Sequence, residues 1–260
     1  MAVPSMTDKG AAAPVSALAP APLPRPVPPL LSFVAGYVDS ITFLALFGFF
    51  AAQVTGSFVV AAAELVVNDR GVAAKMLAIP AFMLGCAFCA VIIIARRGSR
   101  KSSLPFVLAL EGLLLFGFTA LMLYSWPVTD PDSLRGGIAG LLSAAAMGVQ
   151  STLVRLLLRG VPQTNVMTGN STQLAIDATE IVYAMLQPRL ASANPALAEE
   201  IAQSRKRFAT VFMVWSGFLI GAMLGAIAYS LAGPWSACIA ILTVAGLIVW
   251  SASRGGLDPV

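Results

Sequence analysis

Residues 165–177 read Asn-Val-Met-Thr-Gly-Asn-Ser-Thr-Gln-Leu-Ala-Ile-Asp, a run of small hydroxyl and amide side chains inside a very apolar chain. A shorter version, Gln-Val-Thr-Gly-Ser-Phe, occupies residues 53–58. Two polar Thr-Gly breaks at corresponding places in two apolar halves are typical of an internally repeated membrane protein with a shared polar centre. These two stretches, called the Thr-Gly segments below, decide the predicted fold.

The composition requires lipid as the main solvent. Of the 260 residues, 58 % are hydrophobic and only 11 % are charged, whereas a soluble domain averages about 25 % charged residues. The polar surface is too small to cover a globule of this size. The net charge of +4 is modest, and the basic residues border apolar segments without aromatic platforms, so we expect no nucleic-acid partner.

Several kinds of chemistry are excluded by missing residues. The chain has no His, which excludes a His-based metal site, a Ser-His-Asp triad and a His proton relay. Cys86 and Cys89 have the spacing of a redox motif, but they lie inside an apolar run, and we interpret them as packing residues. No nucleophile elbow, metal-ligand set or phosphate loop is present. We therefore expect no enzyme, no metal and no cofactor.

Apolar runs of about 20 residues can cross a hydrocarbon layer of ~30 Å. Residues 1–30 are rich in Pro and Ala and are predicted to form a disordered tail. An amphipathic surface helix is predicted over residues 194–207. The Thr-Gly segments open two further helices, residues 58–67 and a run to about 187, that we expect to re-enter or break within the membrane without crossing. The six predicted membrane spans are residues 30–50, 76–95, 104–126, 138–158, 208–231 and 235–250.

The two halves align as an internal repeat, residues 31–126 and 137–252. Small residues at this spacing allow close helix approach in lipid. The aligned pairs are Gly36 with Gly148, Gly48 with Gly160, Thr55-Gly56 with Thr168-Gly169, Gly85 with Gly217, and Cys89 with Gly221.

Loop charges predict the topology. With six spans, the basic groups at residues 96–101, 205–207 and 254 fall on one side, opposite Asp130 and Asp132, so the positive-inside rule places both termini in the cytoplasm. Three spans per half is an odd number, which requires inverted halves. The predicted fold class is thus an all-α integral membrane protein with six transmembrane helices in two inverted three-helix repeats.

The sequence resembles the YoaK family of bacterial inner-membrane proteins, which carries a domain of unknown function. The resemblance covers residues 31–252 and is carried by Gly-Tyr-Val-Asp at residues 36–39 and by the second Thr-Gly segment. The first segment is similar to the family's first Thr-Gly-Asn motif, with Ser57 where Asn is usual. The resemblance implies a multi-pass protein of the bacterial inner (plasma) membrane and implies no substrate.

Polar backbone breaks survive in lipid only where they are buried in protein or line a cavity. Helices that start at Ser57 or Asn170 would aim free N–H groups at such a centre. One hypothesis is a central site for a small polar or anionic solute. The alternative is that these groups only cap one another and join helices. The candidate substrate-binding residues are Gln53, Thr55, Gly56, Ser57, Gln150, Thr168, Gly169, Asn170, Thr172 and Gln173.

Two acidic residues are candidates for proton or ion coupling, because a lone carboxylate inside the membrane is costly unless it is protonated or paired. Asp39 either exchanges a proton or cation, or caps a nearby helix N-terminus. Glu111 either carries a proton or forms a structural ion pair with Arg155. Three other acidic residues, on the helices opened by the Thr-Gly segments, are interpreted as solvated: Glu64, Asp177 and Glu180.

The expected function is a membrane transport or permeation protein for a small polar or anionic solute, with proton coupling as an option. The alternative is a non-transporting membrane scaffold or sensor that holds partners through residues 1–30 and 194–207. The expected partners are membrane lipid and a small-molecule solute, and a homo-oligomer is left open.

Overall fold

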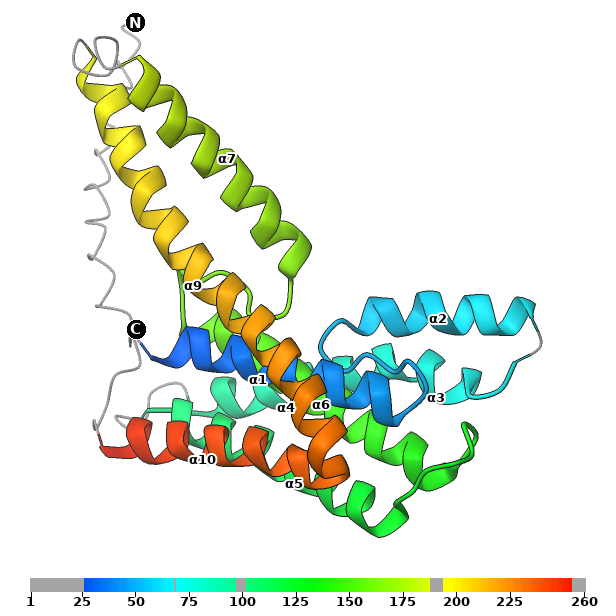
Figure 1. Cartoon of the computed structure of the whole chain (residues 1–260). Coiled ribbons are helices and arrows are strands. Elements are labelled where there is room, and N and C mark those ends of the chain that lie inside the picture. Colours follow the sequence, from blue (N-terminus) through cyan, green and yellow to red (C-terminus); the bar gives the residue numbers. More distant parts are fainter. Residues whose placement is uncertain (1–25, 68, 97–101, 188–193, 254–260) are drawn as a thin grey trace, which may run out of the picture.

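The computed structural model describes residues 26–67, 69–96, 102–187 and 194–253, and within these ranges every regular element is a helix. The predicted all-α class is therefore confirmed. The elements, labelled in Figure 1 except η1, are α1 (Val27–Ala45), α2 (Val54–Val66), α3 (Val72–Met76), α4 (Ala78–Ala95), α5 (Leu104–Ser125), α6 (Leu134–Leu157), α7 (Met167–Leu186), α9 (Pro195–Ala232), the 3₁₀ helix η1 (Gly233–Ala237) and α10 (Cys238–Ser253).

Five helical stretches of the described chain are long and apolar enough to cross a membrane. The last stretch has 59 residues and contains α9 and α10, joined by η1. The chain is thus a multi-pass membrane protein, as predicted. The five stretches are Val27–Ala45, Val72–Ala95, Leu104–Ser125, Leu134–Leu157 and Pro195–Ser253.

The bundle is built from helix pairs that come from different halves of the chain. α1 packs against α9, α4 packs against α6, and α5 packs against both α6 and α10. Glycines allow the two crossings to be close: a Cβ added at Gly36 would lie 2.1 Å from the Phe218 carbonyl oxygen, and one at Gly148 would lie 2.1 Å from that of Phe82. Small residues serve this purpose because lipid offers helices no hydrophobic driving force to associate.

The helices opened by the Thr-Gly segments lie outside this bundle. In Figure 1, α7 runs beside the N-terminal half of α9, and the pair projects away from the other helices. α2 packs against α3 and α4. Both segments follow a similar backbone turn, since Gly48 after α1 and Gly160 after α6 have φ values of 82° and 83°, in the left-handed region that glycine adopts without strain.

Some predicted boundaries were wrong. α1 begins at Val27, inside the predicted tail, with Pro28 and Pro29 in the first turn, where missing N–H donors cost nothing. Residues 1–25 lie outside the described residues, as do 97–101 and 254. The predicted surface helix and the span after it form one helix, α9, of 38 residues. It is continuous because neither Pro nor Gly occurs between Pro195 and Gly217.

Candidate functional site

Asp39 holds the loop between α1 and α2 against the side of α1. Its Oδ1 accepts the N–H of Ala52 at 2.6 Å, and its Oδ2 accepts that of Gln53 at 3.2 Å. Because Asp39 lies more than one turn before the end of α1 at Ala45, the loop has turned back along the helix. The carboxylate therefore fixes the loop just before α2, a structural role close to the capping alternative considered for this residue, although the N–H groups that it binds precede the first residue of the helix, Val54.

The residue after each Thr-Gly pair closes the loop before it. The buried Ser57 hydroxyl accepts the Phe50 N–H at 2.7 Å and donates to the Phe50 carbonyl at 2.9 Å. Asn170 donates through Nδ2 to the Gln163 carbonyl at 2.8 Å. Each contact spans seven residues. The Ser57 hydroxyl and the Asn170 amide thus each fix the loop that precedes their helix.

The loop before α7 is anchored to α1 and α6. Gln150 Nε2 on α6 donates to Thr164 Oγ1 at 2.8 Å and to the Leu31 carbonyl at 2.9 Å. The Ser32 hydroxyl on α1 donates to the Thr164 carbonyl at 3.0 Å. All four side chains of this contact group are buried, and we call them the junction cluster: Ser32, Gln150, Thr164 and Asn165.

The two loops touch at the junction cluster. Asn165 Nδ2 donates to the Ala52 carbonyl at 3.4 Å, and Ala52 is the residue whose N–H binds Asp39. The chain segments that precede the two Thr-Gly pairs therefore meet in the interior. The candidate site residues predicted from sequence did not include Ser32, Thr164 and Asn165, although Asn165 begins the second Thr-Gly segment and Thr164 adjoins it.

Four side chains of the described residues keep buried oxygens without a hydrogen-bond partner: Gln150 Oε1, Asn165 Oδ1, Ser125 Oγ and both carboxyl oxygens of Glu111. The predicted ion pair of Glu111 with Arg155 is wrong. Arg155 is exposed at the end of α6, because its long side chain extends outward from the helix, whereas Glu111 is buried on α5.

An open cavity of about 320 Å³ lies beside the loop held by Asp39. Its walls come from α1, the loop between α1 and α2, and α9. The polar lining is Asp39, Ser40 and Gln53, and the aromatic lining is Phe43, Phe50 and Phe218. Two of the predicted site residues, Asp39 and Gln53, therefore share one cavity.

The other predicted site residues have different surroundings. Thr55, Thr168, Gly169 and Thr172 are exposed, and the Thr172 hydroxyl donates to the Thr168 carbonyl of its own helix. Gly56 lies against the Phe50 ring, where an added Cβ would come within 2.9 Å. Gln173 donates to Asp177 at 2.9 Å. Ser57, Asn170 and Gln150 are the predicted residues that are buried at or near the meeting loops.

Two buried ion pairs attach α2 and α7 to the helices that follow them. Asp177 on α7 is 0 % exposed and accepts from Arg207 Nε on α9 at 2.9 Å. Glu64 on α2 accepts from Nζ of Lys75, which is 2 % exposed, at 2.6 Å. The interpretation of Glu64 and Asp177 as solvated residues was wrong, because each is neutralised by a basic residue that local sequence does not connect to it.

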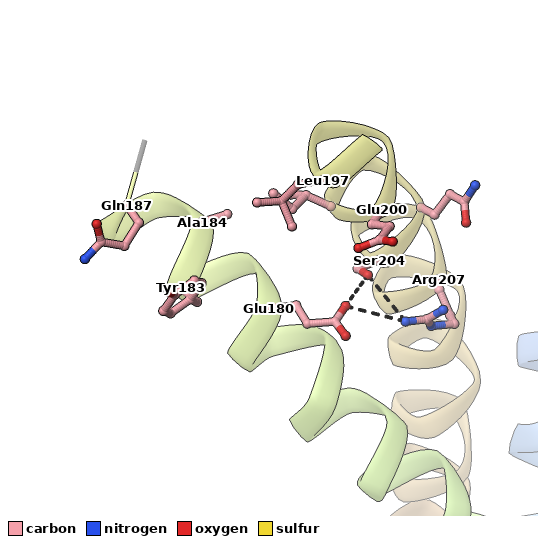
Figure 2. A pocket seen from close by; sticks show the side chains of 10 residues that line it. Glu180, Tyr183, Ala184, Gln187, Leu197, Glu200, Ser204 and Arg207 are labelled. Carbon is pink, nitrogen blue, oxygen red and sulfur yellow. Dashed lines mark hydrogen bonds and ion pairs between the residues drawn. The ribbon is translucent and has the colours of Figure 1, made fainter. Parts of the chain in front are cut away.

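A second cavity, of about 250 Å³, lies between α7 and α9 (Figure 2). Glu180 and Arg207 point toward each other across it, 3.7 Å apart, and Glu180 also accepts from the Ser204 hydroxyl. Arg207 is already bound to Asp177, so this cavity offers no free positive charge. The described residues form no group of three Cys, Asp or Glu that could hold a metal ion.

Comparisons with known proteins give one match. A family model described as "Protein of unknown function (DUF1275)" matches residues 29–250, which include every helix of the bundle. No curated protein and no solved structure matches the chain.

Proposed function

This chain belongs to the DUF1275 family, and from that premise we propose that it is a transport or permeation protein that moves a small polar solute across the membrane. The observation that carries the proposal is the open cavity that reaches the buried carboxylate of Asp39 beside the meeting loops. Irregular backbone within a membrane domain is typical of transporter sites, where it lines a cavity. Intramembrane carboxylates mark substrate or ion pathways.

The proposed architecture is six crossings in two inverted halves. It is supported by a second pair of equivalent contacts: a Cβ at Gly221 would lie 2.1 Å from the Phe33 carbonyl oxygen, and one at Gly85 would lie 2.0 Å from that of Ala145. The sequence alignment that pairs Gly36 with Gly148 and Phe82 with Phe218 also pairs the residues of these two contacts, Phe33 with Ala145 and Gly85 with Gly221. It matches Gly85 with Gly221, one helical turn from the match proposed from sequence.

The Thr-Gly helices fit the same duplication. The sequence alignment that pairs Thr55 with Thr168 also pairs Glu64 with Asp177. Each of these acids forms an ion pair with a basic residue of the next helix. α2 has only 13 residues, and α7 is not among the stretches apolar enough to cross. If α2 and α7 do not cross, the other helices make six crossings. The loop charges then favour a cytoplasmic location for both termini, which is the proposed topology. The resemblance to YoaK proteins adds the bacterial inner membrane as the proposed location.

The solute is proposed to be neutral or cationic rather than anionic. The N–H groups of Ala52 and Gln53 before α2 are already bound to Asp39, so few donors remain for an anion. Glu111 is the proposed proton carrier, because it is fully buried in a membrane helix and, unlike Asp39, has carboxyl oxygens without a hydrogen-bond partner among the described residues.

Uptake into reconstituted vesicles tests the proposal. The wild type is screened with labelled solutes of several classes, next to the variants Asp39→Asn and Gln53→Ala, with Gln203→Ala on the exposed part of α9 as a matched control. We expect uptake of one class, lowered about tenfold or more by both cavity variants and unchanged by the control. Equal uptake by wild type and cavity variants would reject the site.

A membrane scaffold or sensor is the second candidate, favoured by the projection of α7 and α9 from the bundle (Figure 1). Deleting residues 1–25 separates the two candidates, because these residues precede α1. Uptake should survive this deletion, whereas docking of partners through the tail should not.

A further inference from the structure

We infer that the cavity beside Asp39 is a binding site for a small organic cation that carries an alkylammonium group. The inference rests on the proposed function and narrows its solute class. Its grounds are the charge of Asp39, the aromatic lining and the apolar character of the remaining wall.

The Asp39 carboxylate lacks a full counter-charge. It is 4 % exposed, and among the described residues none of the ion pairs includes it. Two backbone N–H groups bind it, and the start of α2 contributes roughly half of a positive charge. These donors stabilise the ionised carboxylate without cancelling its charge, so its negative charge at the cavity wall attracts a cation and repels an anion.

The aromatic lining suits an alkylammonium ion. Phe43, Phe50 and Phe218 come from α1, the loop and α9, and the rings of Phe43 and Phe50 lie with centroids 5.1 Å apart. A cation near aromatic faces is attracted by the ring quadrupole, and quaternary ammonium groups are commonly recognised by such aromatic cages. The alkyl groups of the ion would contact these rings and the side chains of Ala222 and Ala226.

A metal cation fits this cavity less well. Hard cations such as Ca²⁺ take six or more oxygen ligands, whereas the polar lining consists of the Asp39 carboxylate, the Ser40 hydroxyl and the Gln53 amide. The volume of about 320 Å³ is at the lower end of the range of roughly 300–1,000 Å³ for small-molecule pockets. The cavity thus fits a small molecule better than a bare ion.

The test compares choline with its neutral isostere 3,3-dimethylbutan-1-ol, by calorimetric titration of the full-length protein in lipid nanodiscs. The two probes have the same shape and differ by one positive charge, so the main comparison uses the wild-type protein and needs no substitution. We expect choline to bind roughly tenfold or more tightly than the isostere, since the isostere loses the attraction of Asp39 and of the rings. Equal binding of the two, or no binding of choline, would overturn the inference.

Variants locate the site. Asp39→Asn should abolish the preference for choline, and Phe43→Leu should weaken choline binding several-fold, whereas Phe58→Leu on the exposed face of α2 should change nothing. Choline binding that is insensitive to both cavity variants would place the site elsewhere and overturn the inference. Choline binding without uptake would support the cation site and remove the transport proposal. Uptake of another solute without choline binding would support the transport proposal and overturn the cation site.

Discussion

At Gly36 the backbone of α1 meets the Phe218 carbonyl of α9, and at Gly148 the backbone of α6 meets the Phe82 carbonyl of α4. No side chain fits at either point, because an added Cβ would lie 2.1 Å from the oxygen. The first of these crossings fixes where α1 lies against α9, and α1 carries Asp39. The position of the candidate site therefore depends on glycines that do not themselves touch it.

Substituting Gly36 by Ala should destabilise the protein, in spite of the better helix propensity of alanine. The added methyl group must push α9 away, and overpacking of this kind costs typically about 1–3 kcal/mol. Thermal unfolding of the purified protein in detergent measures the effect. Gly246→Ala in α10 is the matched control, because nothing lies within 4 Å of its added Cβ, and it should be neutral or stabilising. Unchanged thermal stability of the Gly36 variant would contradict the described crossing.

At the scale of the elements, α2 and α7 are held in place by polar contacts rather than by deep apolar packing. Each has its start fixed by a hydroxyl or amide. An ion pair of Glu64 holds the last turns of α2, and the pairs of Asp177 and Glu180 with Arg207 hold the middle of α7. The two partners of the α7 pair, Asp177 and Arg207, differ in how deeply they are buried. Asp177 is fully buried, whereas 45 % of the Arg207 side chain is exposed.

We predict that Arg207→Met costs more stability than Asp177→Asn. The first leaves a buried carboxylate without its cation, which costs about 3 kcal/mol, the lower end of the range for broken buried pairs, because Gln173 still donates to Asp177. The second leaves an arginine that can reach water. Hydrogen exchange of the α7 amides and thermal unfolding would measure both, with Arg205→Met as the exposed control. The opposite order of the two variants would refute the assigned burial.

The turn before α3 and the loop before α6 are joined by Asp132, which accepts from the Gly71 N–H at 2.8 Å and from Arg70 Nε at 2.9 Å. The hydrogen bond from the Gly71 N–H is the largest cause, and together with that from Arg70 it lowers the pKa of Asp132 below its ordinary value of 3.8. A carboxyl group with a lowered pKa stabilises the fold above its ordinary pKa and loses this contribution as the pH falls through the lower, folded-state value.

Wild type should therefore melt at a higher temperature than Asp132→Asn at neutral pH, and the difference should shrink below about pH 4. The effect should be small, because the pair is solvent-exposed. Melting temperatures of both proteins across this pH range test it, with Asp69→Asn as an exposed control on the same turn. A difference that grows as the pH falls would have the wrong sign for this explanation.

The sequence allowed prediction of the elements that depend on local apolar content. The span predicted over residues 104–126 is α5, Leu104–Ser125, because an uninterrupted apolar run specifies its own length. Polar contacts between distant residues could not be predicted: Asp177 and Arg207 are 30 residues apart, and no local pattern pairs them. Of the five polar residues expected at the centre, Ser57 and Asn170 are buried, because each binds a carbonyl of the preceding loop, whereas Thr55, Thr168 and Thr172 are exposed.

In the whole molecule, the two loops that precede the Thr-Gly pairs at residues 55–56 and 168–169 meet inside the membrane domain. Asn165 and Ala52 make the direct contact, while Ser32 and Gln150 hold the second loop from α1 and α6. In the proposed duplication this contact lies where the halves face each other. The candidate cavity adjoins the first of the two loops, so under the proposed function this meeting point would lie beside the solute path.

Site-directed cross-linking in native membranes tests directly whether the two loops meet. In a variant whose native cysteines are replaced, Ala52→Cys and Asn165→Cys should be joined rapidly by oxidation or by a short bis-maleimide. The control pairs Ala52→Cys with Ala198→Cys, near the N-terminal end of α9 that projects from the bundle (Figure 1), and it should not react within one molecule. Efficient cross-linking of the first pair alone is the predicted result. No cross-link in the first pair, or equal yields in both, would contradict the meeting of the two loops.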